Sequence, residues 1–142
     1  MNCSDIMKKA VVFLGKGDTA LTAAKLMNDS NVGFLPVCED GKAIGTLTDR
    51  DICCRVVAYD KPSSTFVGDV MTHDVVACLP EDSIDTAAQT MADNQVSRLL
   101  ICDSNNILKG IISLSDLPQA SAEQAYQAFQ GVTERESAPQ PT

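Results

Sequence analysis

The sequence presents one pattern twice, and this internal repeat constrains the fold more than any other feature. Asp5–Met7 returns as Asp69–Met71, and Gly45–Asp51 returns as Gly110–Asp116 after one extra residue near Asn105. Two longer segments recur in the same order, Asp18–Met27 as Asp82–Met91 and Val32–Cys38 as Val96–Cys102. The period is far longer than the roughly 20–50 residues of solenoid repeats. We therefore predict two similar units packed about a pseudo-two-fold axis, with related clefts between them where small ligands bind.

The length of 142 residues fits one compact body made of two halves. A half of about 60 residues would bury too little surface to be secure alone, so we expect the halves to share one core. The chain has no Trp and few aromatic residues, so this core should be aliphatic.

Apolar runs and helical stripes predict an α+β protein with the order β-α-β-β-α in each repeat. Strands are expected at residues 11–14, 34–38 and 43–47, and again at 75–79, 98–102 and 108–112. The first helix of each repeat presents one apolar stripe, Ala20, Ala23, Ala24 and Met27 or Ile84, Ala87, Ala88 and Met91. These helices can be capped by Asp18 or Thr19 and by Asp82 or Ser83.

A second helix closes each repeat, at residues 49–58 and at 115–130. A polar, turn-rich stretch from Tyr59 to Thr65 marks the boundary between the repeats. We predict a first repeat at residues 1–60, a linker at 61–68, a second repeat at 69–130 and a disordered tail at 131–142.

The charge balance is acidic, with 19 Asp and Glu against 11 Lys and Arg, a net charge of −8 and a pI near 4.4. This balance argues against nucleic acid or an anionic membrane surface as the main partner. The sequence has no apolar run long enough to span a bilayer and begins without a signal-peptide pattern, so the expected location is the cytoplasm.

The six cysteines and the single His73 give no metal-site or catalytic pattern. No C-x-x-C spacing occurs, so a zinc site is not expected. Cys38 and Cys102 lie in apolar strands, where a free thiol behaves as a small hydrophobe. The adjacent pair Cys53 and Cys54 is the one remaining candidate for thiol chemistry. No nucleophile, base and orienting group occur together, so we do not expect an enzyme.

Thr48 to Asp51 and Ser113 to Asp116 share a Ser/Thr-x-x-Asp spacing where a strand meets a helix. The same spacing occurs in the helix capping box, and either segment alone is more often a cap than a ligand site. Two observations favour a site: the fourth residue is Asp rather than the longer Glu or Gln, and the motif recurs at the same junction. A carboxylate there can accept hydrogen bonds from both hydroxyls of a ribose diol.

The double repeat, the two Asp-Ile/Val-Met openings and the two Gly-h-h-Ser/Thr-x-x-Asp motifs together resemble a tandem pair of cystathionine-β-synthase (CBS) domains, a Bateman module. Thr48–Ile52 is similar to the phrase typical of small bacterial members. The resemblance covers residues 1 to about 120. It implies a regulatory module that binds AMP, ADP, ATP or S-adenosylmethionine between the repeats and signals to a separate protein. It also implies a homodimer in which two modules pair through their helices into a flat disc.

The resemblance implies two clefts, each with a ribose-binding Asp from one repeat and adenine and phosphate contacts from the other. Cleft one carries Thr48, Arg50, Asp51, Thr72, Ala77, Ser97 and Arg98. Cleft two carries Ser113, Asp116, Lys8, Phe13, Gly33 and Phe34.

The two clefts differ in charge. Arg98 matches a phosphate-binding Arg of the family, and Arg50 can add a second cation, so cleft one should take a phosphorylated nucleotide. Cleft two has Phe34 and Ser115 at those positions, and Phe13 stands where the family has a small residue. We expect cleft two to be empty or to take an uncharged or stacked ligand.

Two hypotheses compete with the nucleotide sensor. One is a ligand-independent dimerisation or docking module, which the crowding by Phe13 and Phe34 supports for cleft two. The other is an enzyme, which lacks a catalytic set of residues. The motif contacts mainly the ribose, so the sequence does not choose among adenosine-containing ligands.

We predict that Asp51→Ala weakens nucleotide binding more than Asp116→Ala, because only the Asp51 cleft is expected to hold Arg98. Asp51→Asn should also weaken binding, since an amide offers the diol one acceptor atom. Calorimetric titration of the three variants with AMP measures this. Equal losses, or a larger loss at Asp116, would refute the asymmetry.

Overall fold

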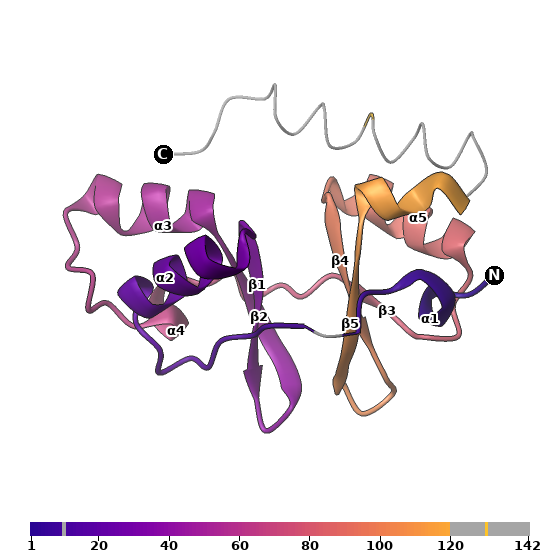
Figure 1. Cartoon of the computed structure of the whole chain (residues 1–142), viewed down its shortest axis with the longest axis horizontal. Coiled ribbons are helices and arrows are strands. Elements are labelled where there is room, and N and C mark those ends of the chain that lie inside the picture. The colour runs from indigo at the N-terminus through magenta and orange to yellow at the C-terminus, as the bar shows by residue number, and fades with distance from the viewer. Residues whose placement is uncertain (10, 120–129, 131–142) are drawn as a thin grey trace. The chain divides into compact units, whose positions relative to one another are not determined.

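The computed structural model describes residues 1–9, 11–119 and 130. It has the mixed helix and strand content of an α+β protein, in two compact units (Figure 1). Unit 1 contains Met1–Val11, Val76–Asn105 and the described residues from Lys109 onward. Unit 2 contains Val12–Val75 and Asn106–Leu108. Within the described part of the chain, no helix has the length and apolar character needed to cross a bilayer.

Unit 2 is built on the hairpin of β1 (Phe34–Glu39) and β2 (Lys42–Thr48), which pair antiparallel with Phe34 opposite Thr48. Asp40 and Gly41, both with positive φ, form its turn, as a tight hairpin requires. The helices α2 (Ala20–Ser30), α3 (Asp49–Arg55) and α4 (Val67–Val70) lie on one side of this hairpin (Figure 1). A short 3-10 helix, η1 (Val57–Tyr59), follows α3.

Unit 1 has a three-stranded sheet in the order β3 (Ala77–Cys78), β4 (Arg98–Cys102) and β5 (Leu108–Ser113). Strands β3 and β4 are parallel, with Ala77 opposite Leu100. The helices are α1 (Cys3–Ile6), α5 (Ile84–Asn94) and the 3-10 helix η2 (Leu114–Gln119).

The structure contains the strands expected at residues 34–38, 43–47, 98–102 and 108–112 and the first helix of each repeat. The caps of these helices fall on Thr19 and Ser83. Thr19 Oγ1 accepts from the Thr22 amide and Ser83 Oγ from the Thr86 amide, each at 3.1 Å. Both helices end at a left-handed residue, Asn31 or Gln95. The predicted apolar stripes are buried except for Ala24, which is exposed.

Several predicted boundaries are wrong. Only Leu14 of residues 11–14 pairs, with Val37, and the second early strand is reduced to two residues. The helix expected at residues 49–58 ends at Arg55. The helix expected from Ser115 is 3-10 as far as Gln119, where Pro118 has no amide hydrogen to donate. The rest of this predicted helix, residues 120–129, lies outside the described residues, and so does the predicted tail at 131–142.

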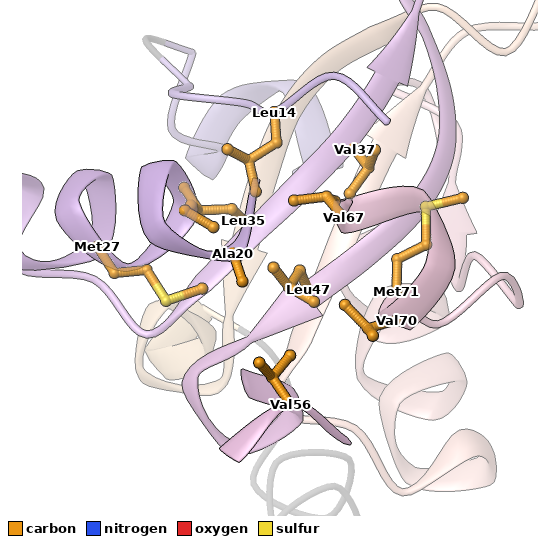
Figure 2. Packing of buried hydrophobic residues seen from close by; sticks show 11 residues of the cluster. Leu14, Ala20, Met27, Leu35, Val37, Leu47, Val56, Val67, Val70 and Met71 are labelled. Carbon is orange, nitrogen blue, oxygen red and sulfur yellow. The ribbon is translucent and has the colours of Figure 1, made fainter. Parts of the chain in front are cut away.

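The prediction of a single shared core is also wrong, because each unit has its own aliphatic cluster. In unit 2, side chains from α2, both strands and α4 converge, as Figure 2 shows for Leu35, Leu47, Val67 and Val70. In unit 1, Met91, Leu99, Ile101 and Ile112 pack with Cys3 from α1.

The two repeats exchange their opening segments. Helix α4 and Met71, which begin the second repeat in sequence, pack in the core of unit 2. Helix α1 begins the first repeat and packs in the core of unit 1. The boundaries predicted at residues 60 and 69 separate the two repeats of the sequence. The compact units have other boundaries, between Val11 and Val12 and between Val75 and Val76.

Two glycines, which have no side chain, leave space for the exchanged segments. A Cβ on Gly45 would lie 2.7 Å from the Thr72 carbonyl oxygen and 2.8 Å from Met71 Sδ. A Cβ on Gly110 would lie 2.7 Å from Met7 Sδ and 2.9 Å from the Lys8 carbonyl oxygen. In each case a backbone atom is among the close neighbours, so the contact cannot be relieved by a side-chain rotation alone.

We predict that Gly45→Ala and Gly110→Ala each lower the free energy of unfolding by about 1–3 kcal/mol, the usual cost of overpacking. Gly17→Ala is the matched control, because a Cβ there meets nothing within 4 Å. Urea denaturation of the three variants measures the effect. Loss of stability at Gly17 comparable to that at Gly45 would show that the close approach is not the cause.

Candidate functional site

The first Ser/Thr-x-x-Asp motif lies where β2 ends and α3 begins. Thr48 Oγ1 accepts from the Asp51 amide, and Asp51 Oδ2 accepts from the Thr48 amide, both at 3.0 Å. This is a complete capping box. The sequence argument took Asp in place of Glu or Gln as a sign against a cap, and it is wrong here, because Asp51 completes the capping box with the extended Thr48.

The second motif shares the backbone contact of the first, but its hydroxyl donates to the carboxylate and does not accept from the amide. Asp116 Oδ2 accepts from the backbone amide and from the hydroxyl of Ser113, both at 2.9 Å. Ser113 is buried, and its Oγ also lies 2.8 Å from Ser115 Oγ. In both motifs, therefore, Oδ2 is fixed by the residue three positions earlier, and the local structure does not use Oδ1 for the cap.

The exchanged segments place Thr72 and Lys8 at equivalent positions near the two motifs. Thr72 exchanges both backbone hydrogen bonds with Thr46 at 2.9 Å, two residues before Thr48. Lys8 exchanges both with Ile111, at 2.9 and 3.1 Å, two residues before Ser113. Unit 2 thus collects Thr48, Arg50, Asp51 and Thr72, and unit 1 collects Ser113, Asp116 and Lys8.

The residues at the start of the next strand also adjoin the motif of their own repeat. The Gly33 carbonyl accepts from the Asp49 amide at 3.0 Å, and Phe34 lies opposite Thr48. The Ser97 carbonyl accepts from the Leu114 amide at 2.9 Å, with the exposed Arg98 beside it. The predicted pairing of Ala77, Ser97 and Arg98 with Asp51, and of Phe13, Gly33 and Phe34 with Asp116, joins residues of different units and stays a prediction.

Arg98 and Phe13 are both available at the surface of their units. Arg98 Nη1 donates to the Ser97 carbonyl and hydroxyl oxygens at 3.4 and 3.3 Å, and no ion pair involves Arg98 among the described residues. Phe13 is 56% exposed, which is unusual for a large apolar side chain.

Sequence reasoning missed Arg55. Its guanidinium lies 3.7 Å from Asp51 Oδ1 through Nη2 and donates to the Val70 carbonyl at 2.9 Å through Nη1. The spacing of four residues from Asp51 on a helix is the signal that could have found the ion pair. The contact with Val70 follows from the exchange of segments and has no local signal.

The cysteines divide into four buried and two exposed thiols. Burial, with smaller contributions from Cys78 and Asp82, raises the pKa of Cys3 from 9.0 to about 11. Burial also raises the pKa of Cys38 and Cys78. Cys53 and Cys54 are exposed on α3. Over residues 1–9, 11–119 and 130, no group of three or more His, Cys, Asp or Glu side chains could hold a metal ion.

Comparison with known proteins identifies the family. The CBS domain model matches residues 3–57 and 67–123. The chain belongs to the CBS domain family. It carries two CBS domains in tandem, as the resemblance in sequence predicted.

A relative and two solved structures illustrate the likeness. The CBS domain-containing protein YhcV of Bacillus subtilis is 40% identical over 131 residues, which cover 91% of this chain and 93% of YhcV. The CBS domain pair of protein MJ0100, in complex with 5′-methylthioadenosine and S-adenosyl-L-methionine, has a TM-score of 0.74 at 22% identity over 84% of this chain and 94% of its own. CBSX2 in complex with AMP has a TM-score of 0.73 at 20% identity, and the match covers 86% of this chain and 96% of CBSX2. These two structures share the fold of the CBS pair.

We predict that iodoacetamide at neutral pH alkylates Cys53 and Cys54 well before Cys3, Cys38 and Cys78. The buried thiols are shielded and hold their protons more tightly, and the thiolate is the reactive form. Peptide mass spectrometry over time measures the order, and the urea-unfolded protein, in which all thiols should react alike, is the control. Native alkylation of Cys3 at the rate of Cys53 would contradict the burial.

Proposed function

We propose that this CBS pair is a regulatory module that binds an adenosine-containing ligand through Asp51 and signals to a separate protein. One observation carries the proposal: each motif fixes one carboxylate oxygen in a cap and keeps the other outside the capping interaction. An ionised carboxylate oxygen held in place in this way can accept a hydrogen bond from a ribose hydroxyl. The same side chain can thus serve as cap and as ligand.

The ligand is proposed to be AMP, ADP, ATP or S-adenosylmethionine. The bound AMP of CBSX2 and the bound 5′-methylthioadenosine and S-adenosyl-L-methionine of MJ0100 support this class, since both proteins have the fold of this chain. The exposed guanidinium groups of Arg50 and Arg98 supply positive charge in an otherwise acidic chain. They favour a phosphorylated ligand in the cleft that Asp51 serves.

The proposed mode of action is a homodimer whose surface changes when the ligand binds. Any signal requires the ligand to bind two arrangements of the module with different affinity. We propose no catalytic role, because the CBS family consists of regulatory modules and no catalytic family is indicated.

The second candidate function is a docking module that binds no nucleotide. The observation in its favour is that both carboxylates already have partners, Thr48 and Ser113, without any ligand. The exposed Phe13 also suits a contact with protein. Ligand binding separates the two candidates.

The deciding experiment is thermal unfolding of the full chain, stripped of co-purified ligand, with AMP, ADP, ATP and S-adenosylmethionine. A ligand at about 100 times its Kd should add roughly 2.7 kcal/mol and raise Tm by several degrees. The shift should vanish in Asp51→Ala but persist in Asp18→Ala, which removes a carboxylate outside the motif that accepts from the Gly15 amide. A folded protein that shows no shift with any compound would favour the docking module.

A further inference from the structure

Arg55 joins two parts of unit 2 that are distant in sequence. One end of its guanidinium faces Asp51 Oδ1 at 3.7 Å, and the other donates to the Val70 carbonyl at 2.9 Å. Asp51 Oδ2 is already held by the Thr48 amide. Arg55 is therefore a partner of the very oxygen that the proposed ribose contact would use.

Val70 ends α4, and its neighbours lead into the second repeat. Helix α4 is a single turn, closed by the hydrogen bond from the Met71 amide to the Val67 carbonyl at 2.9 Å. Thr72 follows directly and pairs with Thr46 on β2. A turn this short depends on tertiary contacts, because isolated short helices are not stable in water. The bond from Arg55 is one of those contacts.

The sequence of the second repeat has no arginine at the position equivalent to Arg55. In the register that aligns Asp51 with Asp116, the position of Arg55 is taken by Ala120. An alanine side chain offers neither a charge nor a hydrogen-bond donor. The sequence therefore offers an arginine at this position only in the first motif, and this difference adds to the one at Arg98.

We propose that Arg55 is a positioning residue that couples Asp51 to the segment Val67–Thr72, so that a ligand on Asp51 loosens the chain where it enters the second repeat. This inference rests on the proposed function of Asp51. A ribose hydroxyl on Oδ1 competes with the Arg55 guanidinium, which then loses the carboxylate that orients it towards Val70. Linkage requires the reverse as well: removal of Arg55 makes Asp51 easier for the ligand to reach.

The first part of the test uses the ligand-free full chain and hydrogen exchange of the amides from Val67 to Thr72. Arg55→Met should speed exchange there, and Asp51→Asn should do so too, because the Arg55 guanidinium contacts both Asp51 and the Val70 carbonyl. In the Arg55→Met background, Asp51→Asn should add nothing. Thr48→Ala is the matched control, because it removes the other half of the cap without touching Arg55. Equal acceleration by Thr48→Ala would show that the effect passes through α3, and would overturn the link.

The second part measures the affinity for 5′-methylthioadenosine, an uncharged probe that carries the ribose diol and no phosphate. Arg55→Met should bind it about twofold to fivefold more tightly, the range expected for an exposed ion pair that no longer competes. Lys25→Met, which removes a charge from the exposed face of α2, should leave the affinity unchanged. A residue with only a structural role would weaken binding when lost, so the sign of the change is decisive.

The two parts fail separately. Unchanged or weaker binding to Arg55→Met, with normal binding to the wild type, would overturn the coupling and leave the proposed function standing. If the wild type binds neither the probe nor AMP, the proposed function is overturned and the coupling with it; if it binds AMP alone, the same comparison of wild type and Arg55→Met is made with AMP.

Discussion

Each compact unit is completed by a short segment that the sequence assigns to the other repeat, and a glycine makes room for it. Met71 and Thr72 approach the backbone at Gly45, and Met7 and Lys8 approach it at Gly110, closer than a methyl group would allow. The buried residues of α4 and α1 then enter the two cores. The predicted single core is replaced by two clusters of buried residues, each of which includes a short segment from the other repeat.

The parts of the fold that local pattern specifies could be predicted from the sequence. The hairpin of unit 2, with Asp40 and Gly41 in its turn, and the helices capped by Thr19 and Ser83 depend on residues close in the chain. The exchange could not be predicted, because a four-residue helix has no measurable periodicity and its apolar residues look the same in either core. Strand lengths failed because an apolar run does not show how many of its residues pair: residues 11–14 form such a run, but only Leu14 pairs, with Val37, as a single bridge.

Sequence analysis selected Asp51 and Asp116 as candidate ligand-binding residues, but it did not expect these carboxylates to accept backbone hydrogen bonds as well. Sequence reasoning treated a cap and a ligand site as alternatives and took the short Asp side chain as evidence against the cap. In the structure Asp51 and Asp116 both bind the amide three residues earlier through Oδ2. A carboxylate has two oxygens, so the cap does not exclude a ligand. It holds the side chain in one orientation, which lowers the entropy cost of binding.

The two motifs differ in the side chain that stands near the second carboxylate oxygen, Oδ1. At Asp51 that oxygen faces Arg55, whose other hydrogen bond holds the end of α4. Under the proposed coupling, a ligand on this oxygen would compete with Arg55 and would thereby affect the segment that leads into the second repeat. At Asp116 the aligned residue is Ala120, so a ligand would meet no such competition from that position. In the proposed function, Arg55 and Arg98 would both contribute to an affinity difference between the clefts, with opposite signs: Arg98 would strengthen binding of phosphorylated ligands, and Arg55 would oppose binding of any ribose. An uncharged and a phosphorylated ligand would then rank the two clefts differently, and that ranking separates the contributions of the two arginines.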